Sequence, residues 1–197
     1  ITKSIKRSQK KIEIEHHKQG PTDIYLLIDC SGSMAGDRLR NVKNAVTALV
    51  TNIVDMNICR IGILAFNSDL HDISDLTNDA SKIITKVKSI SPGGGTMANQ
   101  AFDKAYKKLS ASDNSRQKAV IMLTDGKIFD EAATAQTAVK MRNANMRVIT
   151  IGTADANMKY LKKISSSINN VSDTYPVNDL SNLAKTFRTI INTLKQG

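Results

Sequence analysis

The chain of 197 residues contains no tryptophan and no long hydrophobic run. No stretch approaches the eighteen or so consecutive apolar residues of a transmembrane helix, so we expect no membrane span. Apolar residues still make up 41% of the chain, enough for one α/β domain with a full hydrophobic core. The first residue is Ile rather than Met, which indicates a fragment or a processed chain, so the lack of a signal peptide excludes no compartment.

Cysteine is also scarce, and the two cysteines are placed where a disulfide cannot form. We expect Cys30 at the end of one buried strand and Cys59 at the start of a parallel neighbour, about 20 Å apart. Because a disulfide needs Cα atoms within about 7 Å, both should remain thiols. This favours a reducing compartment, and we expect a cytoplasmic rather than an extracellular location.

Basic residues outnumber acidic ones and give a formal net charge of +10. Residues 1–20 carry a surplus of four positive charges, and Gly20-Pro21 closes this stretch, so we predict a basic lead-in or linker over residues 1–21 and a folded domain over 22–197. A basic tail can bind nucleic acid, anionic lipid or an acidic partner. Because aromatic residues are not interleaved and no reader motif is present, we expect no specific nucleic-acid binding and favour a solvated linker.

Short apolar runs rich in β-branched residues recur along the chain. They occupy residues 24–28, 60–66, 119–123 and 147–151, with a short run near 174–175. Between them, apolar residues recur every three or four positions, as in a helix with one buried face. Two of the helices that this spacing predicts cover residues 37–53 and about 158–166. Residues 70–73 follow a turn signal and should fold back as an antiparallel edge strand. This alternation predicts the α/β class: a doubly wound, mostly parallel sheet with helices on both faces.

Oxygen-bearing side chains follow two of these strands and one glycine run. They are Asp29, Ser31, Ser33, Thr96 and Asp125. In doubly wound sheets, ligands bind beyond the carboxyl ends of the strands, where strand order reverses. Carboxylates and hydroxyls are hard ligands, so we predict a divalent cation, with Mg²⁺ first and Mn²⁺ or Ca²⁺ as alternatives. With both carboxylates ionised, the bare site carries about two negative charges, which such a cation neutralises.

Each of these motifs is ordinary when taken alone, because Asp at a strand end and Gly-rich turns are common structural features. All three motifs at the correct ends of successive strands, and in this order, are hard to obtain by accident. The chain here resembles the von Willebrand factor type A domain, whose integrin relatives are called I domains. The metal-ion-dependent adhesion site of that family reads Asp-x-Ser-x-Ser, then Thr after a Gly-rich loop, then Asp in a Thr-Asp-Gly-like turn. All five residues are present in this chain.

The resemblance implies that the three hydroxyls bind the metal and that the two carboxylates do so directly or through water. It implies a six-stranded sheet of order 3-2-1-4-5-6, with the third strand antiparallel. A partner protein would complete the coordination with an Asp or Glu, and we expect the domain itself to be monomeric. In some relatives, metal ligation moves the last helix, here about residues 179–194. A helix that simply stays docked is the alternative.

Two other functions stay open. Residues 93–96 precede a helix and can cradle phosphate, as in a Mg²⁺-dependent enzyme acting on a nucleotide or phosphoester, but they lack the Gly-Lys-Ser/Thr ending of a P-loop. A serine hydrolase is disfavoured, because Ser31 has no Gly-x-Ser-x-Gly elbow and His71 lies in the predicted edge hairpin. We therefore predict a binding module rather than an enzyme.

The second alternative is a scaffold subunit of a larger ATPase or kinase–phosphatase system, the role of some intracellular relatives. In its two thiols and its lack of tryptophan, the chain resembles stand-alone microbial members of this family, such as tellurium-resistance proteins. This resemblance implies a role in stress response.

Overall fold

The computed structural model describes residues 20–153 and 155–194. The predicted lead-in, apart from Gly20 and Pro21, lies outside these ranges. Within them, every helix is too short or too polar to cross a membrane.

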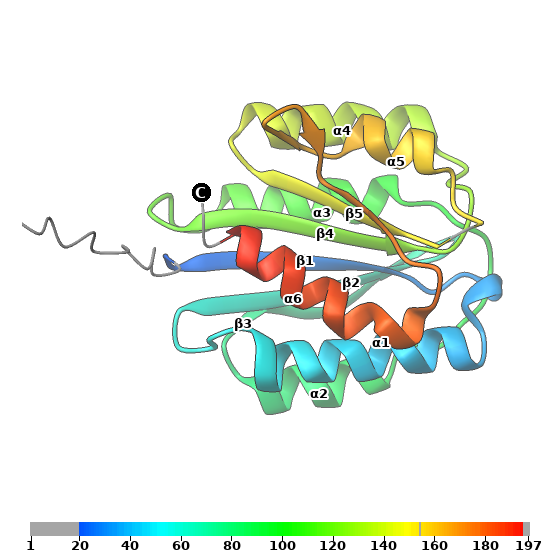
Figure 1. Ribbon diagram of the computed structural model, residues 1–197, viewed down its shortest axis with the longest axis horizontal. Coiled ribbons are helices and arrows are strands. Elements are labelled where there is room, and N and C mark those ends of the chain that lie inside the picture. The colour runs from blue at the N-terminus through cyan, green and yellow to red at the C-terminus, as the bar shows by residue number, and fades with distance from the viewer. Residues whose placement is uncertain (1–19, 154, 195–197) are drawn as a thin grey trace, which may run out of the picture.

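A six-stranded sheet forms the centre of the molecule, in the order β3-β2-β1-β4-β5-β8 (Figure 1). Its strands are β1 (Thr22–Asp29), β2 (Cys59–Phe66), β3 (Leu70–Thr77), β4 (Gln117–Thr124), β5 (Arg147–Gly152) and β8 (Thr174–Pro176). All neighbouring pairs are parallel except β2 with β3, which is antiparallel. The predicted order and the predicted antiparallel edge strand are therefore confirmed.

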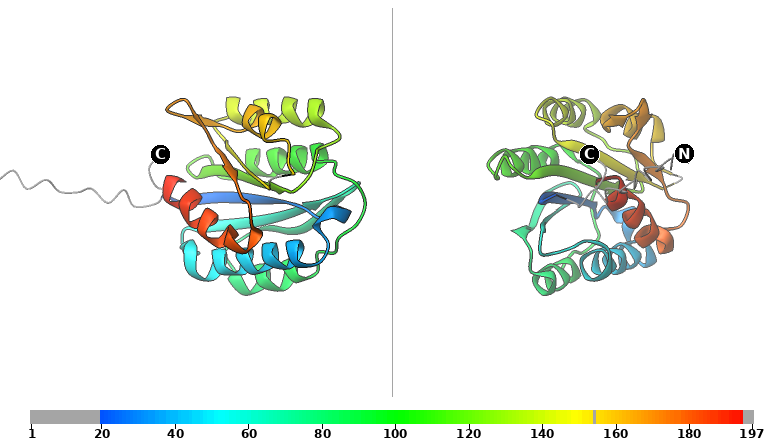
Figure 2. Two further views of the ribbon diagram at one scale, coloured as in Figure 1. Left: turned by 45° about the vertical axis from the view of Figure 1, so that its right-hand side comes forward. Right: turned by 60° about the vertical axis from the view of Figure 1, so that its left-hand side comes forward.

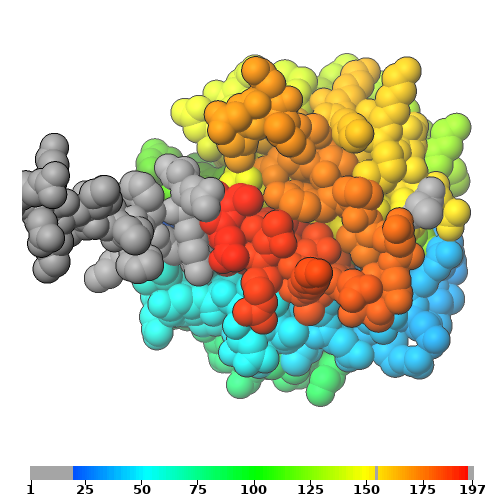
Figure 3. Space-filling model, in the orientation of Figure 1, coloured from blue at the N-terminus to red at the C-terminus, as the bar shows by residue number. Residues whose placement is uncertain are grey.

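Helices cover both faces of the sheet (Figure 2). One face packs against α1 (Asp37–Ala48), α2 (Ala80–Lys88) and α6 (Leu183–Leu194), and the other against α3 (Asn99–Ser110), α4 (Glu131–Asn143) and α5 (Met158–Ile164). Short 3-10 helices occur at η1 (Gly32–Met34) and η3 (Leu180–Asn182). On the face seen in Figure 3, α6 lies between α1 and the segment that carries β8.

The structure differs from the prediction at three places. The last helix, expected over residues 179–194, begins as the 3-10 turn η3 and becomes α-helical only at Leu183. The helix expected over residues 37–53 changes to π-helical geometry in its last turn, η2 (Leu49–Ile53). The helix expected to end near residue 166 stops at Ile164, and a small hairpin of β6 (Ser167–Ile168) and β7 (Val171–Ser172) follows. Asn169 and Asn170 form its turn with φ angles of 51° and 65°, a region that Asn tolerates better than most residues.

Strand β1 lies at the middle of the sheet and is buried on both faces. Ile24 and Leu26 belong to the core under α1, whereas Tyr25 and Leu27 belong to the core under α3. This explains why the strand is an unbroken apolar run instead of an alternating one. Burying each large aliphatic side chain contributes about 1.5–3 kcal/mol, so β1 is firmly anchored.

The two cysteines lie at opposite ends of this part of the sheet. Cys59 pairs with Thr22 at the start of β1, whereas Cys30 follows the end of β1. Both side chains are buried, and no disulfide joins them. The prediction that they remain thiols is confirmed.

Candidate metal centre

Asp29 is the last residue of β1, and its buried carboxylate is held at both oxygens. Oδ1 accepts a hydrogen bond of 2.8 Å from the Ser31 backbone N–H. Oδ2 accepts one of 2.6 Å from Thr124 Oγ1 at the end of β4. The carboxylate is therefore oriented by its own loop on one side and by the neighbouring strand on the other.

The loop after β1 brings two serine hydroxyls together. Since η1 turns the chain directly after Ser31, Ser31 Oγ and Ser33 Oγ lie 3.1 Å apart. Ser33 Oγ also donates a 2.8 Å hydrogen bond to Asp125 Oδ1. The loop after β1 and the loop after β4 thus meet through side chains separated by 92 positions in the sequence.

Thr96 comes from a third loop, which is tied to the first by backbone hydrogen bonds. The Gly32 N–H donates to Gly94 O at 3.0 Å, and the Gly93 N–H donates to Cys30 O at 2.9 Å. A Cβ placed on Gly126 would lie 3.8 Å from Thr96 Oγ1 and 4.0 Å from Ser33 Oγ. The Thr96 hydroxyl therefore faces the same small space as the Ser33 hydroxyl, beside the Asp125–Gly126 turn.

Two buried carboxylates, those of Asp29 and Asp125, lie close enough in this cluster for their negative charges to repel each other. Burial raises the pKa of Asp29, and the negative charge of Asp125 adds to the increase, while hydrogen bonds from Ser31 and Thr124 partly oppose it. The Asp125 side chain is also fully buried and forms an ion pair with Arg38, at the start of α1. The hydrogen bond that Arg38 donates to Asp125 raises the pKa of the Arg38 guanidinium, which stays charged.

The donors gathered here are two carboxylates and three hydroxyls. Within residues 20–153 and 155–194, no three His, Cys, Asp or Glu side chains lie close enough to hold a metal without such hydroxyls. An all-oxygen set of this kind suits Mg²⁺, Mn²⁺ or Ca²⁺ better than a soft-ligand ion. A buried carboxylate with a raised pKa is also one that gains from a nearby cation.

All five residues that the sequence singled out lie in this cluster, but two of their neighbours were not predicted. Thr124 orients Asp29, and its signal was available, because it is the first residue of the Thr-Asp-Gly turn. Arg38 pairs with Asp125, and nothing in the local sequence distinguishes it from the other basic residues of α1. Its role follows only from the approach of α1 to the loop after β4.

A doubly wound sheet with oxygen-bearing side chains beyond the ends of β1 and β4 defines a Rossmann-like domain. The sequence profile of the von Willebrand factor type A domain matches residues 23–189. The chain belongs to this family, which is known for protein–protein adhesion and for binding metal ions at its adhesion site.

Two curated relatives illustrate the similarity. Minor fimbrium subunit Mfa5 of Porphyromonas gingivalis is 26% identical over 169 residues, which cover 82% of this chain and 13% of that protein. The collagen alpha-6(VI) chain of Mus musculus is 30% identical over 172 residues, which cover 82% of this chain and 7% of that one. The chain thus corresponds to a small part of each relative.

Solved structures show the same fold. The vWF domain of the type V pili tip protein Mfa5 from Porphyromonas gingivalis superposes with a TM-score of 0.77 at 16% identity, covering 91% of this chain and 97% of that one. Proximal thread matrix protein 1 from the mussel byssus, in a structure described as having a zinc-occupied MIDAS motif, gives 0.75 at 18% identity, covering 90% and 46%.

Proposed function

We propose that this chain is a metal-dependent protein-binding module. A divalent cation held by Asp29, Ser31, Ser33, Thr96 and Asp125 would be completed by an Asp or Glu carboxylate of a partner protein. The observation that carries the proposal is the meeting of oxygen side chains from three loops. The Ser33–Asp125 hydrogen bond of 2.8 Å links two of them, and the Gly32–Gly94 backbone hydrogen bond ties in the third. Family membership supports it independently.

The hydrogen-bond pattern suits such a site. Ser33 gives its proton to Asp125, so Ser31 is the donor in the 3.1 Å contact between the two hydroxyls, and Ser33 keeps one oxygen lone pair for a cation. Asp29 already accepts two hydrogen bonds, which hold both of its oxygens in place toward the cluster. The hard donor set favours Mg²⁺, with Mn²⁺ and Ca²⁺ as alternatives. Because a mussel byssus relative is described with zinc in this motif, Zn²⁺ belongs in any panel of ions tested.

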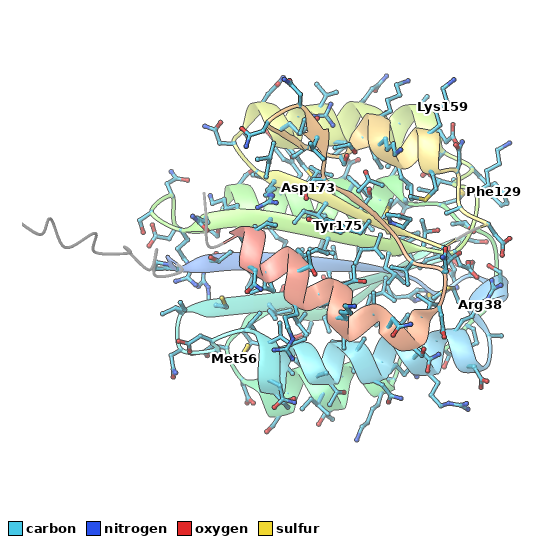
Figure 4. The ribbon with its side chains drawn as sticks, viewed as in Figure 1. Arg38, Met56, Phe129, Lys159, Asp173 and Tyr175 are labelled. Atoms are coloured by element: carbon cyan, nitrogen blue, oxygen red, sulfur yellow. The ribbon has the colours of Figure 1, made fainter. Side chains whose placement is uncertain are left out.

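The rim of the cluster offers a partner both apolar and basic contacts. Five large hydrophobic side chains are exposed in the part of the chain that the structure describes, and two of them, Met97 at 40% and Phe129 at 69%, flank Thr96. The Phe129 N–H donates to Thr96 O at 2.9 Å, which ties its backbone to the Thr96 loop, and its ring lies beside Gly95 of the same loop. Phe129 and Arg38 lie at the same end of the molecule (Figure 4), and Lys127 is exposed between Asp125 and Phe129. These residues suit an acidic side chain with an apolar neighbour.

We propose binding in preference to catalysis. A hydrolytic site needs a general base near the nucleophile or the activated water. His71, the one histidine in the described residues, lies on β3 at the sheet edge and contacts Asn67 Oδ1 at 3.1 Å. A phosphoester or nucleotide enzyme remains the alternative, and turnover of such a substrate that disappears in Asp29→Ala would favour it.

The proposal is tested by selecting binders from a displayed random peptide library on the immobilised domain in Mg²⁺. We expect selected peptides to be enriched in Asp or Glu, to be released by EDTA, and to fail on Asp29→Ala. The matched control is Asp75→Ala, which removes an exposed carboxylate on β3 and should bind as the wild type does. Circular dichroism would verify that both variants are folded.

A second variant distinguishes the contribution of the rim residues to peptide binding from the contribution of the cation. Phe129→Ser should weaken binding of the selected peptides while leaving Mg²⁺ affinity unchanged, because the ring lies beside Gly95, where an added Cβ would come within 3.0 Å of it, and Phe129 is not a proposed ligand. Peptide binding that survives both EDTA and Asp29→Ala contradicts the proposed function.

A further inference from the structure

Asp125 has two polar side-chain partners, one on each carboxylate oxygen. Ser33 Oγ donates to Oδ1, and the Arg38 guanidinium donates to Oδ2. The other arm of Arg38, Nη2, lies 3.3 Å from Asp155 Oδ2 in the loop that follows β5. The guanidinium therefore bridges one carboxylate of the cluster and one carboxylate outside it.

We propose that Arg38 and the divalent cation are alternative partners of Asp125, so that Arg38 sets the affinity of the site for metal. This inference rests on the proposed metal site and adds a residue outside the five-residue motif. Arg carries only donors and no lone pair, so it cannot be a ligand. A guanidinium held against a ligand carboxylate repels a second positive charge at the same group.

The surroundings of Arg38 allow it to leave. It is the second residue of α1, and its side chain is 44% exposed, whereas that of Asp125 is fully buried. Asp155 has a 70% exposed side chain and already contacts the guanidinium, so it can keep that contact after Asp125 is released. Exchange therefore needs a side-chain movement at the surface and no rearrangement of the core.

Because Asp125 is buried, its carboxylate needs a positively charged partner whether or not a cation is bound. An ionised carboxylate without a compensating charge is costly in a protein interior. Arg38 supplies that charge when no cation is bound, and the cation supplies it otherwise. The domain then stays folded at low metal concentration, and the contact with Arg38 raises the metal concentration at which the site fills.

The test measures binding of Mg²⁺ and Mn²⁺ by isothermal titration calorimetry, after EDTA treatment and dialysis. Arg38→Gln should bind both ions about tenfold more tightly, because a charge-assisted hydrogen bond no longer has to be broken. Arg38→Lys keeps the charge but loses the two-armed geometry, so its affinity should fall between those of wild type and Arg38→Gln.

Arg40→Gln is the matched control. Arg40 lies on the same helix, is 67% exposed and pairs with Asp37 instead of a residue of the cluster. Its loss changes the net charge by the same amount, and we expect its metal affinity to stay within twofold of wild type. A comparison of the two Gln variants therefore separates the specific contact from the general electrostatic effect.

Thermal melting supplies a second readout. In EDTA, Arg38→Gln should melt below the wild type because Asp125 loses its positively charged partner, and saturating Mg²⁺ should raise the melting temperature of the variant by more than it raises that of the wild type. Equal affinities in Arg38→Gln and Arg40→Gln, or weaker binding in Arg38→Gln, would overturn the competition while leaving the metal site intact. If the wild type binds no divalent cation at all, the proposed function fails together with this inference.

Discussion

Thr124 Oγ1 donates a 2.6 Å hydrogen bond to Asp29 Oδ2, joining the ends of two neighbouring parallel strands. The same hydroxyl accepts a hydrogen bond of 3.2 Å from the Gly126 N–H. That second contact directs the Thr124 proton toward Asp29. A residue outside the five-residue motif thus fixes the orientation of its first carboxylate.

Replacing Thr124 by Val should weaken metal binding by about tenfold, because residues that orient ligands typically contribute 10–100-fold to affinity. It should also lower the free energy of unfolding by about 1–2 kcal/mol, since a buried carboxylate loses a hydrogen-bond donor. Calorimetric titration and urea denaturation measure the two effects. Thr150→Val is the control, because Thr150 is equally buried on β5 but bonds to Thr174 Oγ1 away from the cluster. Equal metal affinity in both variants would contradict the role given to Thr124.

The raised pKa of Asp29 predicts how stability depends on pH. The folded chain holds the Asp29 proton more tightly than the unfolded chain, whose carboxyl has a pKa near the ordinary value of 3.8. The contribution of Asp29 to stability is therefore fully present below that value and is lost as pH rises through the folded pKa. In EDTA, the difference in unfolding free energy between wild type and Asp29→Asn should shift against the wild type as pH rises above about 4. Saturating Mg²⁺ should remove this trend, because the cation replaces the proton.

Asp23, near the other end of β1, supplies a control of opposite sign. Burial alone would raise its pKa, but hydrogen bonds from Arg60 and Arg116 outweigh burial and hold the pKa below 3.8. Its contribution to stability is present above the unfolded pKa and is lost as pH falls through the folded pKa. Asp23→Asn should therefore cost the most at neutral pH. A pH trend of the same sign for Asp29 and Asp23 would contradict one of the two assignments, and the direction of the trend would show which one.

The close approach of Gly62 to Tyr25 predicts that a larger residue at position 62 lowers the stability of the domain. They are paired in the β1–β2 register, and a Cβ on residue 62 would lie 2.3 Å from Tyr25 Cε1. Because Tyr25 is fully buried, its ring has little room to move, and Gly62→Ala should lower the free energy of unfolding by about 1–3 kcal/mol. In Gly93→Ala, the new Cβ would meet nothing within 4 Å, so urea denaturation should show a change within about 0.5 kcal/mol. Equal stability of the two variants would refute the steric argument.

Much of the fold could be predicted from the local pattern of apolar residues along the sequence. The apolar run of β1 indicated a strand buried on both faces, and the alternation of strands and helices indicated the doubly wound sheet. The β6–β7 hairpin was missed although Asn169 and Asn170 signal a turn, because strands of two residues carry no periodic pattern. The π-helical turn at Leu49–Ile53 had no signal that we can identify.

Several expectations stay predictions. They concern the cytoplasmic location, the role in stress response, the boundary at residue 21, the monomeric state and any movement of the last helix. They depend on partners, conditions or residues outside the described part of the chain.

By itself, the sequence determined which residues end each strand and which chemical groups stand there, because strand periodicity and turn signals act over a few neighbouring positions. Only the tertiary structure decided which of those groups meet. The contacts of Asp125 with Ser33 and Arg38 join positions 92 and 87 residues apart, and the bond between Thr124 and Asp29 spans 95. Such contacts arise from the packing of α1 and the parallel register of β1 with β4, which depend on the whole core.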